Sequence, residues 1–236
     1  MSDRLDLLAN ATWHALTGPQ AGAGVRARHA ARFLPDVCPF VALDDPADPE
    51  AWADLAGLLG PGGRGMLFRD AVEVPPGWSE QWRGAGVQMV AHACVGPRRP
   101  AAEPAAEVVD LDETDATAMR DLVGRTEPGP WEARTHTLGP FVGVKVAERL
   151  VAMAGTRLHP APYREISAVC TDADQRGRGL AGLLITRLAA GMRERGETPF
   201  LQAAAWNAGA IRLYRELGFE ITREVVFAAV TAPDVS

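Results

Sequence analysis

The chain has 236 residues and a mass of 25.1 kDa, enough for one large domain or two small ones, each with its own core. A hydrophobic content of 47% and a mean hydropathy of -0.06 are ordinary for a soluble globular protein. The net charge of -6 is spread over interspersed acidic and basic residues, which argues against a nucleic-acid or membrane partner. We find no membrane-spanning run and no signal pattern, and expect a cytoplasmic protein.

Cysteine and histidine give no metal or disulfide pattern. The three cysteines are far apart and odd in number: Cys38, Cys94 and Cys170. Three histidines are isolated from one another in the sequence, which predicts no metal ligation: His14, His29 and His92. One lysine, Lys145, among the basic residues and abundant alanine indicate a GC-rich bacterial genome.

Residues 1–95 read as a mixed α/β region. Asp48 as N-cap and Pro49 at the first helical position start a predicted helix. Apolar residues at helical spacing follow, and Gly60 ends it. Short strands are predicted at 66–68 and 87–90. Since no catalytic constellation is found here, we expect a structural or substrate-shaping role.

A proline- and alanine-rich segment, 96–106, is typical of a linker and predicts two domains, 1–95 and 107–236. The second half alternates strands and helices. Strands are predicted at 108–109, 141–146, 150–158, 165–171, 199–205 and 221–230, with helices at 114–123, from 180 and after 207.

The densest signal is a glycine-rich turn, 171–181, between a strand and a helix. Such a turn leaves backbone N–H groups free at the positive end of a helix dipole, which suits a pyrophosphate. Gly177 and Gly179 allow a close approach of the backbone, and Arg176 and Arg178 add positive charge. The Walker ending Gly-Lys-Ser/Thr is absent, and the loop falls too late in the domain for a dinucleotide fingerprint.

This turn resembles the acyl-CoA-binding motif of the GNAT superfamily, Arg/Gln-x-x-Gly-x-Gly/Ala, through Arg176, Gly179 and Ala181. Segments 165–171 and 199–205 resemble the family's fourth and fifth strands. Residues 207–219 resemble the closing signature Asn-x-x-Ala-x-x-x-Tyr-x-x-x-Gly-Phe. The order and spacing agree over slightly more than half of the chain, which is not expected by chance.

The resemblance implies an α/β (α+β) GNAT fold, a mixed but mostly antiparallel sheet flanked by helices. A smaller α/β domain, or a degenerate second GNAT-like half, would precede it. Acetyl-CoA is the implied cosubstrate, with no metal. A splay between the fourth and fifth strands would admit the pantetheine arm, in contact with Val169 and Thr171. The residues expected around the rest of CoA are Asn207, also a good helix N-cap, and Arg176, Gly177, Arg178, Gly179, Leu180 and Ala181.

In the implied reaction, an amine attacks the thioester carbonyl and the CoA thiolate leaves. Deprotonating a lysine-like amine at pH 7 costs roughly 4.6 kcal/mol, so a general base is useful. Glu165 is the candidate base, because alignment on the glycine loop gives it the position of the glutamate base in the histone-acetylating branch. An ordinary polar residue at a strand start is the alternative. Strand alternation predicts one face for Glu165, Ser167, Val169 and Thr171, with Cys170 buried on the other.

Tyr214 is the candidate acid for the leaving thiolate, since the family's final-helix tyrosine often lies near the CoA sulfur. Simple packing is the alternative. A backbone N–H near Val169 would meet the oxyanion. An acyl-cysteine intermediate is not expected.

The family walls its acceptor site with the segment after the first helix, here 125–136. Trp131 and Arg134, beside Glu132, are candidate acceptor-binding residues, unless the segment is simply an exposed loop. The leading hypothesis is an N-acetyltransferase for an amine of a small molecule or peptide, acting as a monomer or homodimer. The alternatives are transfer of a longer acyl group, an oxygen nucleophile, or a non-catalytic acyl-CoA sensor.

Overall fold

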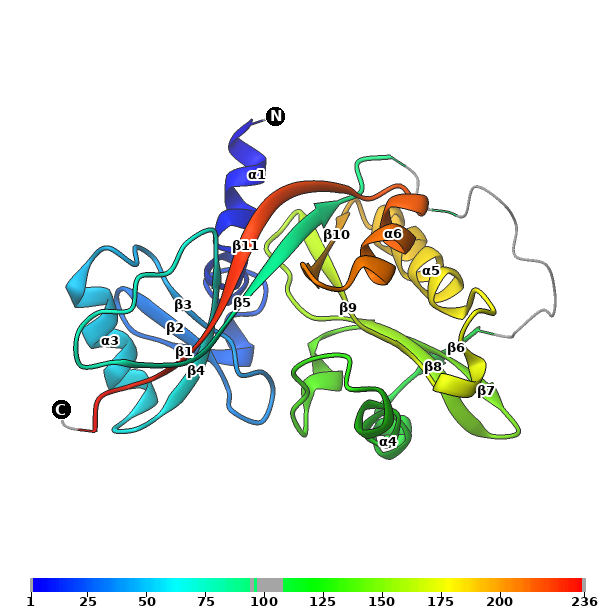
Figure 1. The fold of residues 1–236 in the computed structure, drawn as a ribbon, viewed down its shortest axis with the longest axis horizontal. Coiled ribbons are helices and arrows are strands. Elements are labelled where there is room, and N and C mark those ends of the chain that lie inside the picture. Colours follow the sequence, from blue (N-terminus) through cyan, green and yellow to red (C-terminus); the bar gives the residue numbers. More distant parts are fainter. Residues whose placement is uncertain (1, 94–95, 97–107, 235–236) are drawn as a thin grey trace.

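The computed structural model describes residues 2–93, 96 and 108–234 (Figure 1). Within them lie the helices α1 (Ser2–Ala9), α2 (Ala11–Leu16), α3 (Pro49–Leu59), α4 (Ala116–Thr126), α5 (Leu180–Glu194) and α6 (Ala208–Glu216). The strands are β1 (Gly24–Arg26), β2 (Ala30–Phe33), β3 (Val41–Leu43), β4 (Arg64–Arg69), β5 (Ser79–Val90), β6 (Val108–Leu111), β7 (Phe141–Val146), β8 (Arg149–Thr156), β9 (Tyr163–Thr171), β10 (Thr198–Ala204) and β11 (Glu220–Thr231). None of the helices in these described ranges is long and apolar enough to cross a membrane.

The predicted elements are confirmed, and several more are present. The Asp48 side chain caps α3 by accepting a hydrogen bond from the Glu50 amide at 2.9 Å. The strands predicted at 66–68 and 87–90 are parts of the longer strands β4 and β5. Helices α1 and α2 and the small antiparallel sheet β1–β2–β3 lie in a stretch for which no element was predicted.

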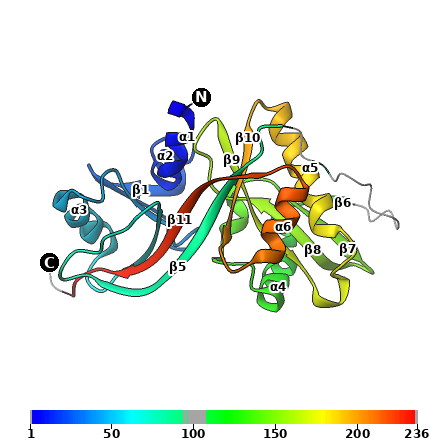
Figure 2. The same cartoon turned by 45° about the horizontal axis from the view of Figure 1, so that its top comes forward.

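A single eight-stranded sheet runs through both halves of the chain, in the order β4-β11-β5-β10-β9-β8-β7-β6. Strand β5, from the N-terminal part, lies between β10 and β11 and is antiparallel to both. Figure 2 shows β5 and β11 side by side along the bridge between the halves. The predicted linker, Gly96 apart, and Cys94 lie outside the described residues, so the division into 1–95 and 107–236 stays a prediction about domains.

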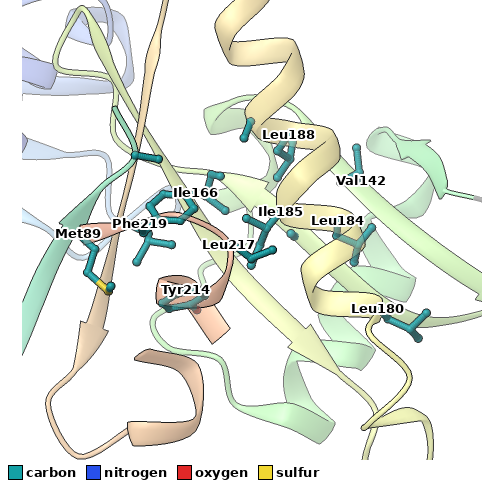
Figure 3. Packing of buried hydrophobic residues seen from close by; sticks show 14 of the residues in the cluster. Met89, Val142, Ile166, Leu180, Leu184, Ile185, Leu188, Tyr214, Leu217 and Phe219 are labelled. Atoms are coloured by element: carbon teal, nitrogen blue, oxygen red, sulfur yellow. The ribbon is translucent and has the colours of Figure 1, made fainter. Parts of the chain in front are cut away.

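Helices cover both faces of the sheet. Helices α5 and α6 pack on one face, where Leu184 and Ile185 of α5 meet Ile166 of β9 in the main core cluster (Figure 3). Helix α4 packs on the opposite face, in a separate cluster that includes Met153 and Cys170. The N-terminal helices and β2 pack on that second face around Tyr163 and the buried strand residues near it.

Candidate active site

The sheet opens between β9 and β10. The two strands run parallel and are paired from Tyr163↔Thr198 to Ile166↔Leu201. Beyond this point β10 continues beside β5, through Gln202↔Gln88, while β9 continues beside β8. The strands therefore part in the way that the family resemblance implies, and Figure 1 shows them diverging.

A β-bulge changes the direction of side chains along β9. Ala168 has a φ of 52°, and the pairing of β8 with β9 shifts by one residue between Met153↔Cys170 and Gly155↔Ser167. Met153 and Gly155 share a face, so Cys170 and Ser167 do as well. The predicted alternation is therefore wrong beyond Ser167: Cys170 lies on the face of Glu165, and Val169 and Thr171 lie on the other face. The prediction that Cys170 is buried is confirmed, at 7% exposure.

The glycine-rich loop is an open cradle of backbone donors. Gly177 and Gly179 have φ values of 77° and 76°, in the left-handed region that favours glycine. Gly179 is the N-cap of α5 and offers no side chain, so the first N–H groups of the helix have no side-chain cap. Residues 176–179 are exposed. The loop presents free donors and the positive end of a 15-residue helix to solvent, which fits a pyrophosphate.

Charged residues fix the start of this loop. Asp172 is 3% exposed and accepts hydrogen bonds from Arg125 Nε at 2.8 Å and from Arg149 Nη2 at 2.7 Å. The hydrogen bond from Arg125 is the main reason that the pKa of Asp172 is lowered. Arg125 also donates to the Leu150 carbonyl at 3.1 Å. These contacts join the end of β9 to α4 and β8. Sequence reasoning missed this cluster, although Asp172 stands directly before the loop.

Two arginines within the loop keep donors available. Arg176 donates to the Thr171 carbonyl at 3.3 Å, and Arg178 donates to the side chain of Gln175. Both arginines are exposed, so their guanidinium groups can still reach an anion at the helix terminus.

Tyr214 is the buried residue of α6 and belongs to the main core cluster (Figure 3). It is 8% exposed, and its ring meets Phe219 edge-on at a centroid distance of 6.3 Å. Burial raises the pKa of its phenol to about 12. The alternative given by the sequence, that Tyr214 packs in the core, is therefore confirmed. A neutral phenol is also what a proton donor requires, and its role as acid stays a prediction.

Glu165 is sealed in an ion pair. Its side chain is 1% exposed and accepts hydrogen bonds from Arg157 Nη2 at 2.7 Å and Nε at 3.1 Å, and from the Leu158 amide at 3.2 Å. The Arg157 guanidinium in turn lies 4.5 Å from the ring centroid of Phe40, in the N-terminal part. Glu165 thus belongs to the contact between the two halves of the chain. Glu165 can act as a base in this position only if the acceptor amine or a water molecule comes within hydrogen-bonding distance of its carboxylate.

The predicted acceptor segment lies against the N-terminal part. Trp131 packs edge-on against Phe141 at 5.5 Å, and Arg134 pairs with Asp36 at 3.1 Å. Glu132 lines a cavity of about 200 Å³ together with residues of β2–β4 and the loops between them: Arg32, Phe33, Pro35, Cys38, Pro39, Phe40, Val41 and Arg64. Trp131 and Arg134 therefore have structural partners, and their contact with an acceptor stays a prediction.

Asn207 caps α6. Its side-chain oxygen accepts a hydrogen bond from the Ala210 amide at 3.1 Å, so the capping role expected from the sequence is confirmed. Residue 207 is exposed, and a contact with CoA remains compatible with capping.

His29, isolated in the sequence, lies among acids in the structure. Its Nδ1 is 2.8 Å from Asp44 Oδ2, and potential ligand atoms of His29, Asp48 and Glu50 lie within 4.8 Å of one another. The hydrogen bond with Asp44 raises the pKa of His29. Because Asp48 already caps α3, the ion pair and the cap account for the arrangement, and we assign no metal to it.

The comparison with solved structures identifies the family. A GNAT-family protein from Novosphingobium aromaticivorans is 40% identical, with a TM-score of 0.83, over 94% of this chain and 97% of that one. The chain belongs to the GNAT family of acetyltransferases. The family model described as FR47-like protein matches residues 141–228. A GCN5-related N-acetyltransferase from Kribbella flavida shares the fold at 18% identity, with a TM-score of 0.60 and 95% of each chain covered. No curated protein matches the chain.

Proposed function

We propose that the chain transfers an acetyl group from acetyl-CoA to a primary amine of a small molecule or peptide. The observation that carries this proposal is the exposed, uncapped N-terminus of α5, with two left-handed glycines, beside the opening between β9 and β10. The loop from Arg176 to Ala181 would bind the pyrophosphate through backbone N–H groups. Val169 and Thr171, which lie beyond the bulge on the face covered by α5 and α6, would contact the pantetheine arm, and Asn207 would contact CoA.

Direct attack of the amine on the thioester is supported by the state of the cysteines. Burial raises the pKa of the Cys38 thiol to about 12 and that of the Cys170 thiol to about 11. A buried thiol that stays protonated is a poor nucleophile, so neither of these two cysteines suits an acyl-enzyme. In the direct reaction, the amine nitrogen bonds to the carbonyl carbon and the C–S bond breaks. The nitrogen loses a proton and the thiolate gains one.

We propose that Tyr214 donates the proton to the leaving thiolate. Replacing its hydroxyl in Tyr214→Phe should lower kcat by about 100-fold, the scale of general acid catalysis. The dissociation constant of acetyl-CoA should not change. Because burial raises the pKa of the phenol to about 12, the acid form persists below that pH, and loss of this acid should cause no fall in kcat up to pH 10.

The matched control is Tyr163→Phe, which removes the hydroxyl of a buried tyrosine that faces the N-terminal part. This control should change kcat by less than about 3-fold. An unchanged kcat in Tyr214→Phe would leave Tyr214 with a packing role alone.

Thiol release from acetyl-CoA tests the proposed function. The test amines are glycine, L-lysine, benzylamine, spermidine, L-phenylalaninamide and phenethylamine, with an amine-free blank. The proposal predicts thiol release above the blank with at least one amine, together with its N-acetyl product by mass spectrometry. Binding of acetyl-CoA without product from any amine would favour an acyl-CoA sensor. Turnover only with a longer acyl-CoA would instead correct the acyl group.

A further inference from the structure

Gln202, on β10, has a buried side-chain amide that no described residue satisfies. Both its Nε2 and its Oε1 are shielded from solvent, and neither has a hydrogen-bond partner among the described residues. Buried polar groups are normally paired, because a buried polar atom without a hydrogen-bond partner lowers the stability of the fold. The unpaired amide of Gln202 therefore requires an explanation, and the position of Gln202 in the sheet provides one.

The residue lies where the sheet opens. Leu201 forms the last pair with β9, and Gln202 is the next residue, paired only with Gln88 of β5. Leu201 and Ala203 belong to the core under α5 and α6, so Gln202 points to the other face. Phe200, two residues earlier on that face, is in register with Glu165 of β9.

Gln202 shares this face with Glu165, the candidate base. Val169 and Thr171, proposed to contact the pantetheine arm, lie on the face covered by α5 and α6, while Glu165 and Ser167 lie on the face of Gln202. Gln88, across from Gln202, is fully buried and donates to the Leu8 carbonyl at 3.1 Å, but its own Oε1 is also unpartnered within the described chain. Two glutamines in register on β10 and β5 therefore each carry an unpartnered amide oxygen within the described chain.

A glutamine amide recognises a group that both donates and accepts. Its Oε1 accepts a hydrogen bond from an amine N–H, and its Nε2 donates one to an oxygen. A ligand that satisfies both atoms carries an amine and a neighbouring carbonyl, as an α-amino amide or a peptide N-terminus does. Sites built to hydrogen-bond a substrate group discriminate strongly against analogues that lack it, because the protein groups are then left unpaired.

We propose that Gln202 is an acceptor-binding residue, and that the acceptor is a primary amine with a neighbouring carbonyl oxygen. This inference rests on the proposed function, because it assumes that an amine enters the opening between β9 and β10. The residues of the N-terminal part that pack around Phe200 would then cover the acceptor side of the sheet.

The test compares two amines that share an aromatic body, L-phenylalaninamide and phenethylamine, of which only the first has a carbonyl. Their binding to the CoA-saturated protein is measured by calorimetry for the wild type and for Gln202→Met, which keeps the volume and removes both polar atoms. The wild type should bind L-phenylalaninamide more tightly than phenethylamine. Gln202→Met should weaken L-phenylalaninamide binding by about 10- to 100-fold and remove the preference.

Stability separates this role from a structural one. Replacing an unsatisfied buried amide by an apolar group should leave the urea midpoint unchanged or raise it. The matched control is Thr231→Val, which removes a buried and equally unpartnered hydroxyl at the far end of β11, where Thr231 pairs with Ser79. This control should also keep or raise the midpoint, but with amine binding unchanged.

Each outcome decides. Three results would overturn the role of Gln202. They are equal binding of L-phenylalaninamide by the wild type and Gln202→Met, no binding of L-phenylalaninamide by the wild type, and a lowered urea midpoint in Gln202→Met. Amine binding that depends on Gln202 but is not followed by thiol release would support the binding role and reject acetyl transfer.

Discussion

A fragment of residues 107–236 should fail to fold into a stable monomer, although it holds every motif of the family resemblance. Strands β10 and β11 are not neighbours in the sheet, because β5 lies between them. Strand β11 has eleven residue pairs with β5 and β10 has five, and all of these are lost with the N-terminal part. The fragment would expose unpaired strand edges and the apolar residues under α5 and α6. We expect aggregation or a chain without a cooperative urea transition.

A cleavable full-length chain supplies the control. A protease site placed within 97–106 should be cut without separating the halves, since the pairs of β5 with β10 and β11 hold them together. The nicked protein should elute in size-exclusion chromatography as the intact one does. A soluble, monomeric 107–236 fragment with cooperative unfolding would contradict this account and support two independent domains.

Replacing Arg157 should be among the most destabilising single changes in the chain. In Arg157→Met, the carboxylate of Glu165 would stay at 1% exposure without its bidentate partner, and removing one partner of a buried pair costs about 3–5 kcal/mol. The contact of Arg157 with Phe40 across the two halves would be lost as well. Urea unfolding followed by circular dichroism measures the change in the free energy of unfolding.

The double variant Arg157→Met/Glu165→Leu isolates the cause, because it removes both charges and fills similar volume. It should recover most of the lost stability, since apolar replacement of a whole buried pair is often neutral. A double variant as unstable as Arg157→Met would show that packing, and not the unpaired charge, sets the loss. Glu165→Gln separately tests the base predicted from the sequence. A fall in kcat without a fall in the urea midpoint would support catalysis, and an unchanged kcat would leave Glu165 as an anchor between the halves.

Local signals in the sequence were sufficient for the loop and the elements around it. Gly177 and Gly179 each need a left-handed φ, and the residues after them repeat at helical spacing, so loop and helix follow from adjacent residues. The N-cap roles of Asp48 and Asn207 were equally readable, since capping uses residues three positions apart or fewer.

Long-range pairing could not be read in the same way. The insertion of β5 between β10 and β11 depends on partners more than one hundred residues away, which no local pattern encodes. The bulge at Ala168 carries no glycine to mark it, so alternation assigned the wrong face to Val169, Cys170 and Thr171. Gln202 was missed because its signal, an unpartnered amide, exists only once the strands are paired.

The most direct test of the central claim is a calorimetric titration of acetyl-CoA into the wild type, Gly179→Glu and Gly196→Glu. Gly179 is the N-cap of α5, and Gly196 follows the C-cap at the other end of the helix. Their φ values are 76° and 73°, so the two variants carry the same added charge and a similar backbone strain. We predict micromolar binding by the wild type, binding within about 3-fold of it in Gly196→Glu, and no measurable binding in Gly179→Glu, where a carboxylate opposes the pyrophosphate. A folded wild type that does not bind acetyl-CoA, or a Gly179→Glu variant that binds as tightly as the wild type, would contradict the account.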